Sequence, residues 1–173
     1  MSGLLTIPSS TLLWALAVVL AALFGGFVHA FLVLERPLAP DNSFKYEFAA
    51  TPARAGDMFR RWGAAGRPIM RRSLHLDFYF MVVYAFMYAV LTLLATRGVA
   101  HAWAQPFGLW LVLAPFVAWV LDIVENLGLL AALNQYKTPP AGPLAVSTAA
   151  ASIKFVLLLA CSLFWLGVIF RLL

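Results

Sequence analysis

Four long apolar stretches constrain this chain more than any other feature. They cover residues 11–34, 74–95, 106–133 and 148–170. A helix needs about 20 apolar residues to cross the hydrocarbon core of a bilayer, so each stretch is long enough to span it. The 173-residue chain is 64% hydrophobic and only 11% charged, which is too apolar for a soluble domain. We therefore predict one integral membrane domain, residues 1–173, with the all-α fold of a four-helix transmembrane bundle.

The positions of Lys and Arg predict how the chain lies in the membrane. Eight of the twelve basic residues fall between the first two spans: Arg36, Lys45, Arg54, Arg60, Arg61, Arg67, Arg71 and Arg72. The other two loops carry Arg97 and Lys137. Because basic loops stay in the cytoplasm, we expect a multi-pass protein of the cell inner membrane with both termini outside. The lipid bilayer then explains the net charge of +5 without a nucleic-acid partner.

Within the first loop, "TPARAGDMFRRWG" predicts a surface helix over about residues 52–64. Thr51 suits a helix cap and Pro52 suits the first helical position. Four apolar residues then follow at i, i+3, i+4 and i+7: Ala55, Met58, Phe59 and Trp62. With arginines beside them, this pattern is typical of an amphipathic helix at a membrane surface. We expect a cytoplasmic helix that acts as an anchored connector or as a lid.

Small residues in the first and last spans predict close helix packing. The segment "AALFGG" lies in the first span and "AAAS" opens the last. Small side chains let helix backbones approach one another in a membrane, so we expect both spans to press against their neighbours there.

Several polar residues lie inside the predicted spans, where each charge costs at least about 2.5 kcal/mol. They are His29, Asp77, Asp122, Glu125, Asn126 and Lys154. At a rise of about 1.5 Å per residue, and with the orientation above, all of them fall in the cytoplasmic half of the bilayer. Each of the four spans supplies at least one. We therefore expect a single polar cluster inside the bundle.

The spacing within two spans supports this cluster. Asp122, Glu125 and Asn126 are at i, i+3 and i+4, so they share one helix face. Asp77 and Tyr84 are at i and i+7, with Tyr88 on the same stripe. These two faces can point inward and leave an apolar exterior for lipid.

A cluster of three carboxyl groups and one ammonium cannot be fully ionised when buried. A protonated carboxyl beside an ionised one is suited to acid–base chemistry on a lipophilic small molecule. The candidate catalytic residues are Asp77, Tyr84, Asp122, Glu125, Asn126 and Lys154. In this hypothesis Asp122 or Glu125 is the proton donor or base. Asn126 and Tyr84 orient the substrate, and Lys154 keeps the other carboxylate ionised.

Other functions are compatible with the same residues. The cluster can hold helix register in a scaffold or accessory subunit, with a partner chain or a second copy. It can bind Mn²⁺, Fe²⁺ or Zn²⁺ through His29 and the three carboxylates, although D-x-x-E-N is not a strong metal motif. An ion conductor ranks last, since four helices leave little room for a pore. The sequence has no Gly-rich phosphate loop and no haem ligand pair, so it identifies no cofactor.

The order of four segments resembles an uncharacterised family of small bacterial four-span membrane proteins. These segments are "ATPARAGDMFRRWGAAGR", "RRSLHLDFYFMVVYA", "LDIVENLGLL" and "ASIKF". The family shares a Leu-Asp-Phe entry, an Asp-x-x-Glu-Asn core and a lysine at the start of the last span. The resemblance runs from about Phe48 to Phe155 and includes the six candidate residues above. It implies a shared site and names no reaction, and His29 matches none of the family's pattern.

Overall fold

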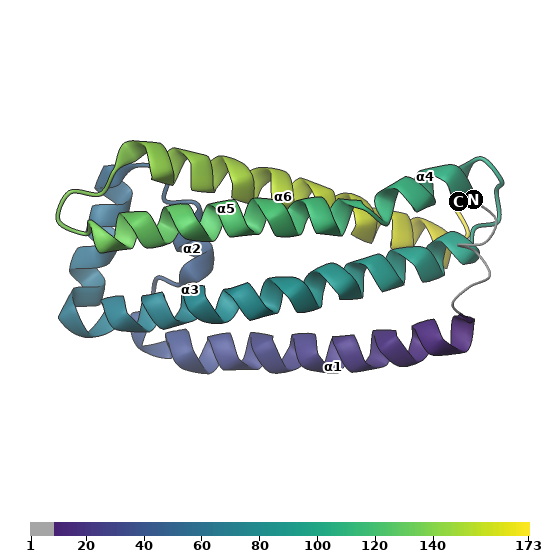
Figure 1. Cartoon of the computed structure of the whole chain (residues 1–173), viewed down its shortest axis with the longest axis horizontal. Coiled ribbons are helices and arrows are strands. Elements are labelled where there is room, and N and C mark those ends of the chain that lie inside the picture. The colour runs from purple at the N-terminus through teal and green to yellow at the C-terminus, as the bar shows by residue number, and fades with distance from the viewer. Residues whose placement is uncertain (1–8) are drawn as a thin grey trace.

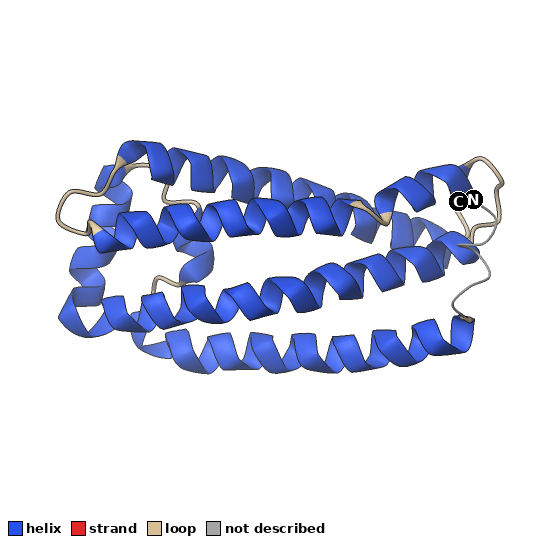
Figure 2. Ribbon diagram, in the orientation of Figure 1, coloured by secondary structure: helices blue, strands red, loops and turns tan. Residues whose placement is uncertain are grey.

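The computed structural model describes residues 9–173, and within this range every regular element is a helix, as predicted (Figure 2). The elements are α1 (Ser10–Glu35), η2 (Arg36–Leu38), α2 (Ser43–Glu47), α3 (Pro52–Arg97), α4 (Ala104–Leu111), α5 (Ala114–Asn134) and α6 (Ala141–Ile169). Four segments of this range are long and apolar enough to cross a membrane: Ser10–Leu38, Pro52–Arg97, Ala104–Asn134 and Ala141–Ile169. The predicted four-helix bundle is confirmed.

Helix α3 is the centre of the bundle, because it contacts every other long helix (Figure 1). Helices α5 and α6 pack along each other over the most extensive interface, whereas α1 lies at the edge and packs mainly against α3. As a result, α1 buries only Leu13, Ala17 and Glu35. Its remaining surface is largely exposed and apolar, as expected of a helix that faces hydrocarbon.

The prediction of close packing through small residues holds for α6 and fails for α1. Ala150 and Ala151 are buried in α6. In contrast, a Cβ atom built on Gly25 or Gly26 would meet no other atom within 4 Å. The reason is rotational: in this part of α1 the aromatic residues Phe24, Phe27 and Phe31 pack on Phe80 of α3, so Gly25 and Gly26 face outward.

Helix α3 bends sharply at Gly63, which separates the surface helix from the second span. Gly63 has φ 61°, a left-handed conformation that glycine adopts without strain. The second segment then begins directly after Gly63, about ten residues before the apolar stretch that starts at residue 74. The apolar stretch shows only which part of the helix can lie in hydrocarbon. The helix itself begins earlier, and its first turns carry exposed polar residues such as Arg71 and Arg72.

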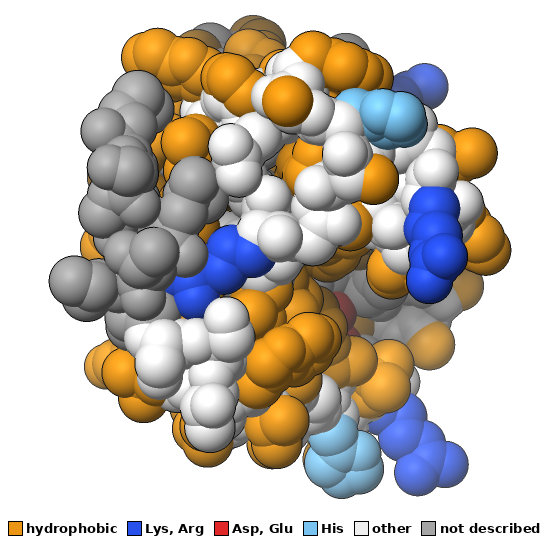
Figure 3. Space-filling view, turned by 90° about the vertical axis from the view of Figure 1, so that its right-hand side faces the viewer, with side chains coloured by type: hydrophobic (Ala, Val, Ile, Leu, Met, Phe, Trp, Pro, Cys, Tyr) orange, Lys and Arg blue, Asp and Glu red, His pale blue; other side chains and the backbone are white. Residues whose placement is uncertain are grey.

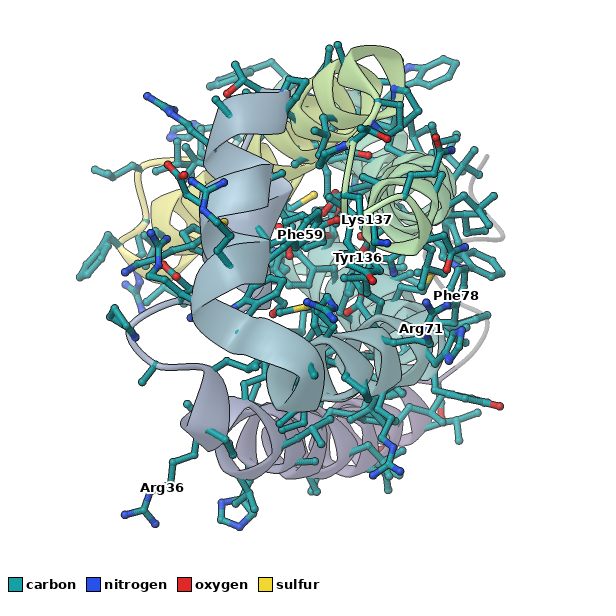
Figure 4. All side chains as sticks on the ribbon, turned by 90° about the vertical axis from the view of Figure 1, so that its left-hand side faces the viewer. Arg36, Phe59, Arg71, Phe78, Tyr136 and Lys137 are labelled. Carbon is teal, nitrogen blue, oxygen red and sulfur yellow. The ribbon has the colours of Figure 1, made fainter. Side chains whose placement is uncertain are left out.

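The surface helix is present, and its apolar face packs onto the end of the bundle instead of lipid. Thr51 caps it by accepting a hydrogen bond from the Arg54 N–H at 3.3 Å. Its buried side chains Ala55, Met58, Phe59 and Trp62 join one core cluster with Tyr46, Leu74, Leu129, Leu133 and Leu144. Figure 4 shows this segment crossing the end of the bundle with Phe59 directed inward and Arg36 outward. The helix therefore closes this end of the molecule.

The last two spans differ from prediction in their first halves. The third is broken into α4 and α5 at Val112 and Leu113, just before Pro115 enters the first turn of α5. The fourth begins at Ala141 instead of residue 148, directly after Pro140. Near this start, α6 lies so close to α5 that a Cβ on Gly128 would sit 2.9 Å from the Pro143 carbonyl oxygen and overlap Ser147 Oγ.

We predict that Gly128→Ala lowers the free energy of unfolding by about 1–3 kcal/mol, because the added methyl overpacks the α5–α6 contact. Gly26→Ala is the matched control, since a Cβ there meets nothing within 4 Å. Thermal unfolding of both variants in detergent measures the difference. Equal stability of the two variants would contradict the close approach of α5 and α6.

Candidate functional site

The ammonium of Lys154 joins two carboxyl groups inside the bundle. Lys154 Nζ on α6 lies 2.8 Å from Asp122 Oδ1 and 2.8 Å from Glu125 Oε2. Asp122 and Glu125 are one turn apart on α5, so their shared helix face brings both to the same lysine. All three side chains are buried, with Glu125 at 0% exposure. This ion-pair group links α5 to α6.

Two hydrogen bonds connect the same face of α5 to α3. The Tyr84 hydroxyl donates to Asp122 Oδ2 at 2.7 Å. The Asn126 amide donates to Asp77 Oδ2 at 2.6 Å. The structure thus brings together all six candidate residues predicted from the sequence. Their arrangement joins α3, α5 and α6, while α1 contributes none of them.

Glu47 is a further member of this cluster that the sequence did not reveal. Its Oε2 lies 3.6 Å from Lys154 Nζ. Burial raises the pKa of Glu47 well above the usual value, and the charge of Lys154 opposes this shift. Glu47 ends α2, in a segment outside the predicted spans, so no helical periodicity pointed to it.

Local contacts of α2 explain how Glu47 reaches the cluster. Asn42 caps α2 by accepting a hydrogen bond from the Lys45 N–H at 3.0 Å. The Thr148 hydroxyl of α6 donates to the Glu47 carbonyl oxygen at 2.8 Å. Phe48 stacks against Phe155 of α6, with ring centroids 5.8 Å apart. These contacts fix α2 beside α6 and direct Glu47 toward Lys154.

The assembled cluster has more negative groups than positive ones. Four carboxyl groups, from Glu47, Asp77, Asp122 and Glu125, surround one ammonium. Glu47 Oε2 and both carboxyl oxygens of Glu125 are buried without a hydrogen-bond partner. Buried carboxylates require neutralisation, so this cluster must hold protons or bind a positive group.

A cavity of about 800 Å³ adjoins the cluster. Five polar residues of the cluster line it: Glu47, Asp77, Tyr84, Asp122 and Lys154. Its walls are apolar and come chiefly from α1, α3 and α6, with Phe24, Phe31, Phe80, Phe155, Leu158 and Leu159 among them. Viewed from the end of the molecule that carries the termini, an acidic side chain is visible deep in a hollow between apolar ones (Figure 3). Glu125 and Asn126 lie behind this lining and do not contribute to it.

His29 does not join the site. It is exposed on α1 and does not line the cavity. Within residues 9–173, no group of three or more His, Cys, Asp or Glu side chains is arranged to hold a metal ion. The expected inward position of His29 is therefore wrong, and the ligand set of the metal hypothesis is not assembled in this range.

Two further acidic residues of the cavity lining, Glu35 and Asp41, already have partners. Glu35 accepts hydrogen bonds from the Ser73 hydroxyl and from the Ser43 N–H, the latter at 3.0 Å. Asp41 accepts a hydrogen bond from Arg61 Nε at 2.6 Å. These contacts hold the segment between α1 and α3 against the bundle. Among the carboxyl groups that line the cavity, those of Glu47 and Asp77 therefore have the fewest hydrogen-bond donors.

Comparison with protein-family models, curated proteins and solved structures finds no match to this chain. The resemblance to a four-span family remains a prediction. Function must therefore be inferred from the polar cluster and the cavity that it lines.

We predict that Lys154→Met lowers the free energy of unfolding by about 3–5 kcal/mol, because it leaves buried carboxylates without their cation. Lys137→Met is the control at an exposed position (labelled in Figure 4) and should change stability by at most about 0.5 kcal/mol. Chemical unfolding in detergent measures both. If Lys154→Met is as mild as the control, the ammonium does not hold the cluster together.

The raised pKa of Glu47 gives a prediction for pH. In the unfolded chain this carboxyl ionises near pH ~4.3, whereas the folded protein keeps the proton to higher pH. Its stabilising contribution is therefore lost as pH rises from the unfolded pKa through the folded one. Glu47→Gln cannot ionise, so its melting temperature should rise relative to wild type as pH increases. The exposed Asp57→Asn is the control, and an unchanged difference across pH would contradict the burial of Glu47.

Proposed function

We propose that this protein binds a lipophilic small molecule in the cavity beside α3 and exchanges a proton with it. The observation that carries this proposal is that Tyr84, Asp122 and Lys154 line an 800 Å³ cavity. A network that only held helix register would be packed solid. Pockets for small molecules are typically about 300–1,000 Å³, mostly apolar, with a few convergent polar groups. The cavity fits this description in size and lining.

The hydrogen bonds suggest which group accepts a proton. Asp122 receives donors on both oxygens, from Lys154 at 2.8 Å and Tyr84 at 2.7 Å. These two donors hold the Asp122 carboxyl group in a fixed position at the cavity, so we assign Asp122 the role of the base. Glu47 and Asp77 face the same cavity and receive fewer donors. We assign them the role of carboxylic acids that return the proton.

The remaining two candidates position these groups without touching the ligand. Glu125 shares Lys154 with Asp122 and lies behind the cavity lining. Asn126 donates to Asp77 and fixes its orientation. The sequence offered either Asp122 or Glu125 as the proton donor or base. We assign the base to Asp122, because it lines the cavity and Glu125 does not.

The proposed orientation gives the ligand a route to the site. The end of the bundle that carries residues 36–72 is assigned to the cytoplasm of the cell inner membrane, because eight basic residues lie there. The part of the cavity that Glu35 and Asn42 line then lies at the level of the cytoplasmic headgroups. Since α1 packs mainly on α3, a lipid-soluble molecule can enter between α1 and α6 from the bilayer.

A scaffold or accessory subunit is the second candidate. It is favoured by the way the cluster joins three helices through Lys154, Tyr84 and Asn126. This role needs no occupant in the cavity, so ligand retention separates the two candidates.

We predict that the protein purified in mild detergent retains one hydrophobic small molecule per chain. Val28→Trp should lower retention, because Val28 lines the cavity on α1 and an indole there would project into the space that the molecule occupies. Val19→Trp is the matched control, since Val19 is 57% exposed on the same helix outside the cavity lining. Native mass spectrometry with solvent extraction measures the bound molecule. An empty wild type, or equal retention by Val28→Trp, would overturn the proposed pocket.

Proton exchange is tested on the same bound molecule. In D2O, Asp122 should remove a proton from a carbon beside a carbonyl group or double bond of the bound molecule, where the C–H bond is acidic. A deuteron should replace that proton, which mass spectrometry detects as a mass increase that survives return to H2O. Asp122→Asn should retain the molecule and lose the exchange, because an amide is not a base. Exchange that persists in Asp122→Asn would assign the base elsewhere, and retention without any exchange in wild type would leave a binding protein.

A further inference from the structure

The lining of the cavity has a surplus of hydrogen-bond acceptors. Five acidic side chains but only two basic ones line it: Glu35, Asp41, Glu47, Asp77 and Asp122, against Arg36 and Lys154. Glu35 and Asp41 are satisfied by their contacts with Ser43, Ser73 and Arg61. The surplus is therefore concentrated deeper, at Glu47 and Asp77.

The available donors do not meet this demand. Lys154 Nζ donates a hydrogen bond to Asp122 at 2.8 Å and lies 2.8 Å from Glu125 Oε2, so its charge is already shared between these two carboxyl groups. Its 3.6 Å separation from Glu47 Oε2 exceeds the usual hydrogen-bond range of about 2.7–3.2 Å. Glu47 Oε2 is accordingly buried without a hydrogen-bond partner. Glu47 and Asp77 both line the cavity. A ligand that brings positive charge and N–H donors would meet their cavity-facing oxygens, and its charge would also offset that of the buried Glu47 Oε2.

Aromatic rings flank the carboxyl groups on two sides. On the α6 side, Phe44 and Phe155 lie with ring centroids 5.6 Å apart, and Lys154 Nζ already lies 5.0 Å from the Phe155 ring. On the α1 side, Phe80 contacts Phe31 at a centroid distance of 5.5 Å. Aromatic faces attract ammonium groups within about 6 Å, so the walls and the carboxyl groups favour the same chemistry.

The cavity continues beyond the carboxyl groups as an apolar slot. Both Asp77 and Tyr88 of α3 line it, and eleven helical residues correspond to about 17 Å. Leu158 and Leu159 line the α6 side of this stretch. A single hydrocarbon chain is suited to such a slot when its polar head lies beside Asp77.

We propose that the ligand is a single-chain lipophilic amine that takes a proton from the carboxylic acid of Glu47 or Asp77. The resulting ammonium lies between the two carboxyl groups, and the chain lies along the slot. This inference rests on the proposed function, since it names the class of molecule for the same cavity. A fatty acid would place a further negative charge beside four carboxyl groups. A neutral alcohol would supply one donor and no charge.

The test compares three probes of equal chain length: dodecylamine, dodecanol and dodecanoate. Each is added at the same concentration to the full chain in phosphatidylcholine nanodiscs, and native mass spectrometry counts the probe retained per protein. We expect one dodecylamine per chain and about tenfold less dodecanol, because charge-assisted hydrogen bonds are roughly twice as strong as neutral ones. Glu47→Gln or Asp77→Asn should lower dodecylamine retention and leave dodecanol unchanged. Asp57→Asn, at a carboxyl outside this cavity, should behave as wild type.

Each other outcome overturns a distinct statement. If dodecanol or dodecanoate is retained as well as dodecylamine, the cavity binds lipophilic molecules but has no preference for an amine. Dodecylamine retention that neither Glu47→Gln nor Asp77→Asn lowers would also reject the amine site. Failure to retain any of the three probes would reject the pocket itself, and with it the proposed function.

Discussion

One ammonium group, that of Lys154, holds the interior of this bundle together. In hydrocarbon an unpaired charge is too costly to bury, and Lys154 meets Asp122 and Glu125 at 2.8 Å each. Because Asp122 also accepts from Tyr84 of α3, the lysine connects three helices through a single carboxylate. Helix α2 is drawn to the same point through Glu47. The relative rotation of α3, α5 and α6 depends on this shared contact.

Helix α1 is attached differently, and this difference shapes the cavity. Near one end Glu35 accepts a hydrogen bond from Ser73 of α3, and near the other Arg97 donates to Ser10 at 3.2 Å. Between these contacts, Phe24 and other rings of α1 pack on Phe80. Aromatic packing is less directional than an ion pair, so α1 can shift without breaking the cluster. A cavity wall of this kind suits a site that is filled from the bilayer.

The sequence predicted the four spans and the six clustered residues because both follow from local patterns. Hydropathy sets the depth of a residue, and i, i+3, i+4 spacing sets a shared face. For His29 the predicted depth in the membrane was not enough to predict an inward position. A single polar residue does not fix the rotation of α1 about its axis. Glu47 was missed because its place depends on Asn42, Thr148 and aromatic contacts that form only after the chain folds back. Likewise, the sequence showed the apolar face of the surface helix but not that the bundle end would cover it.

The surplus of carboxyl groups favours a ligand-binding role for the cluster over a role in holding helix register alone. To hold register, one lysine and one carboxylate on facing helices suffice, and each extra buried carboxyl adds a desolvation cost. Here Glu47 and Asp77 are extra, and both line the cavity. Apolar residues of similar size would stabilise a bundle with no ligand better. A site that takes up a proton or an ammonium needs these groups where they lie, which is why we place the proposed function at the cavity side of the cluster.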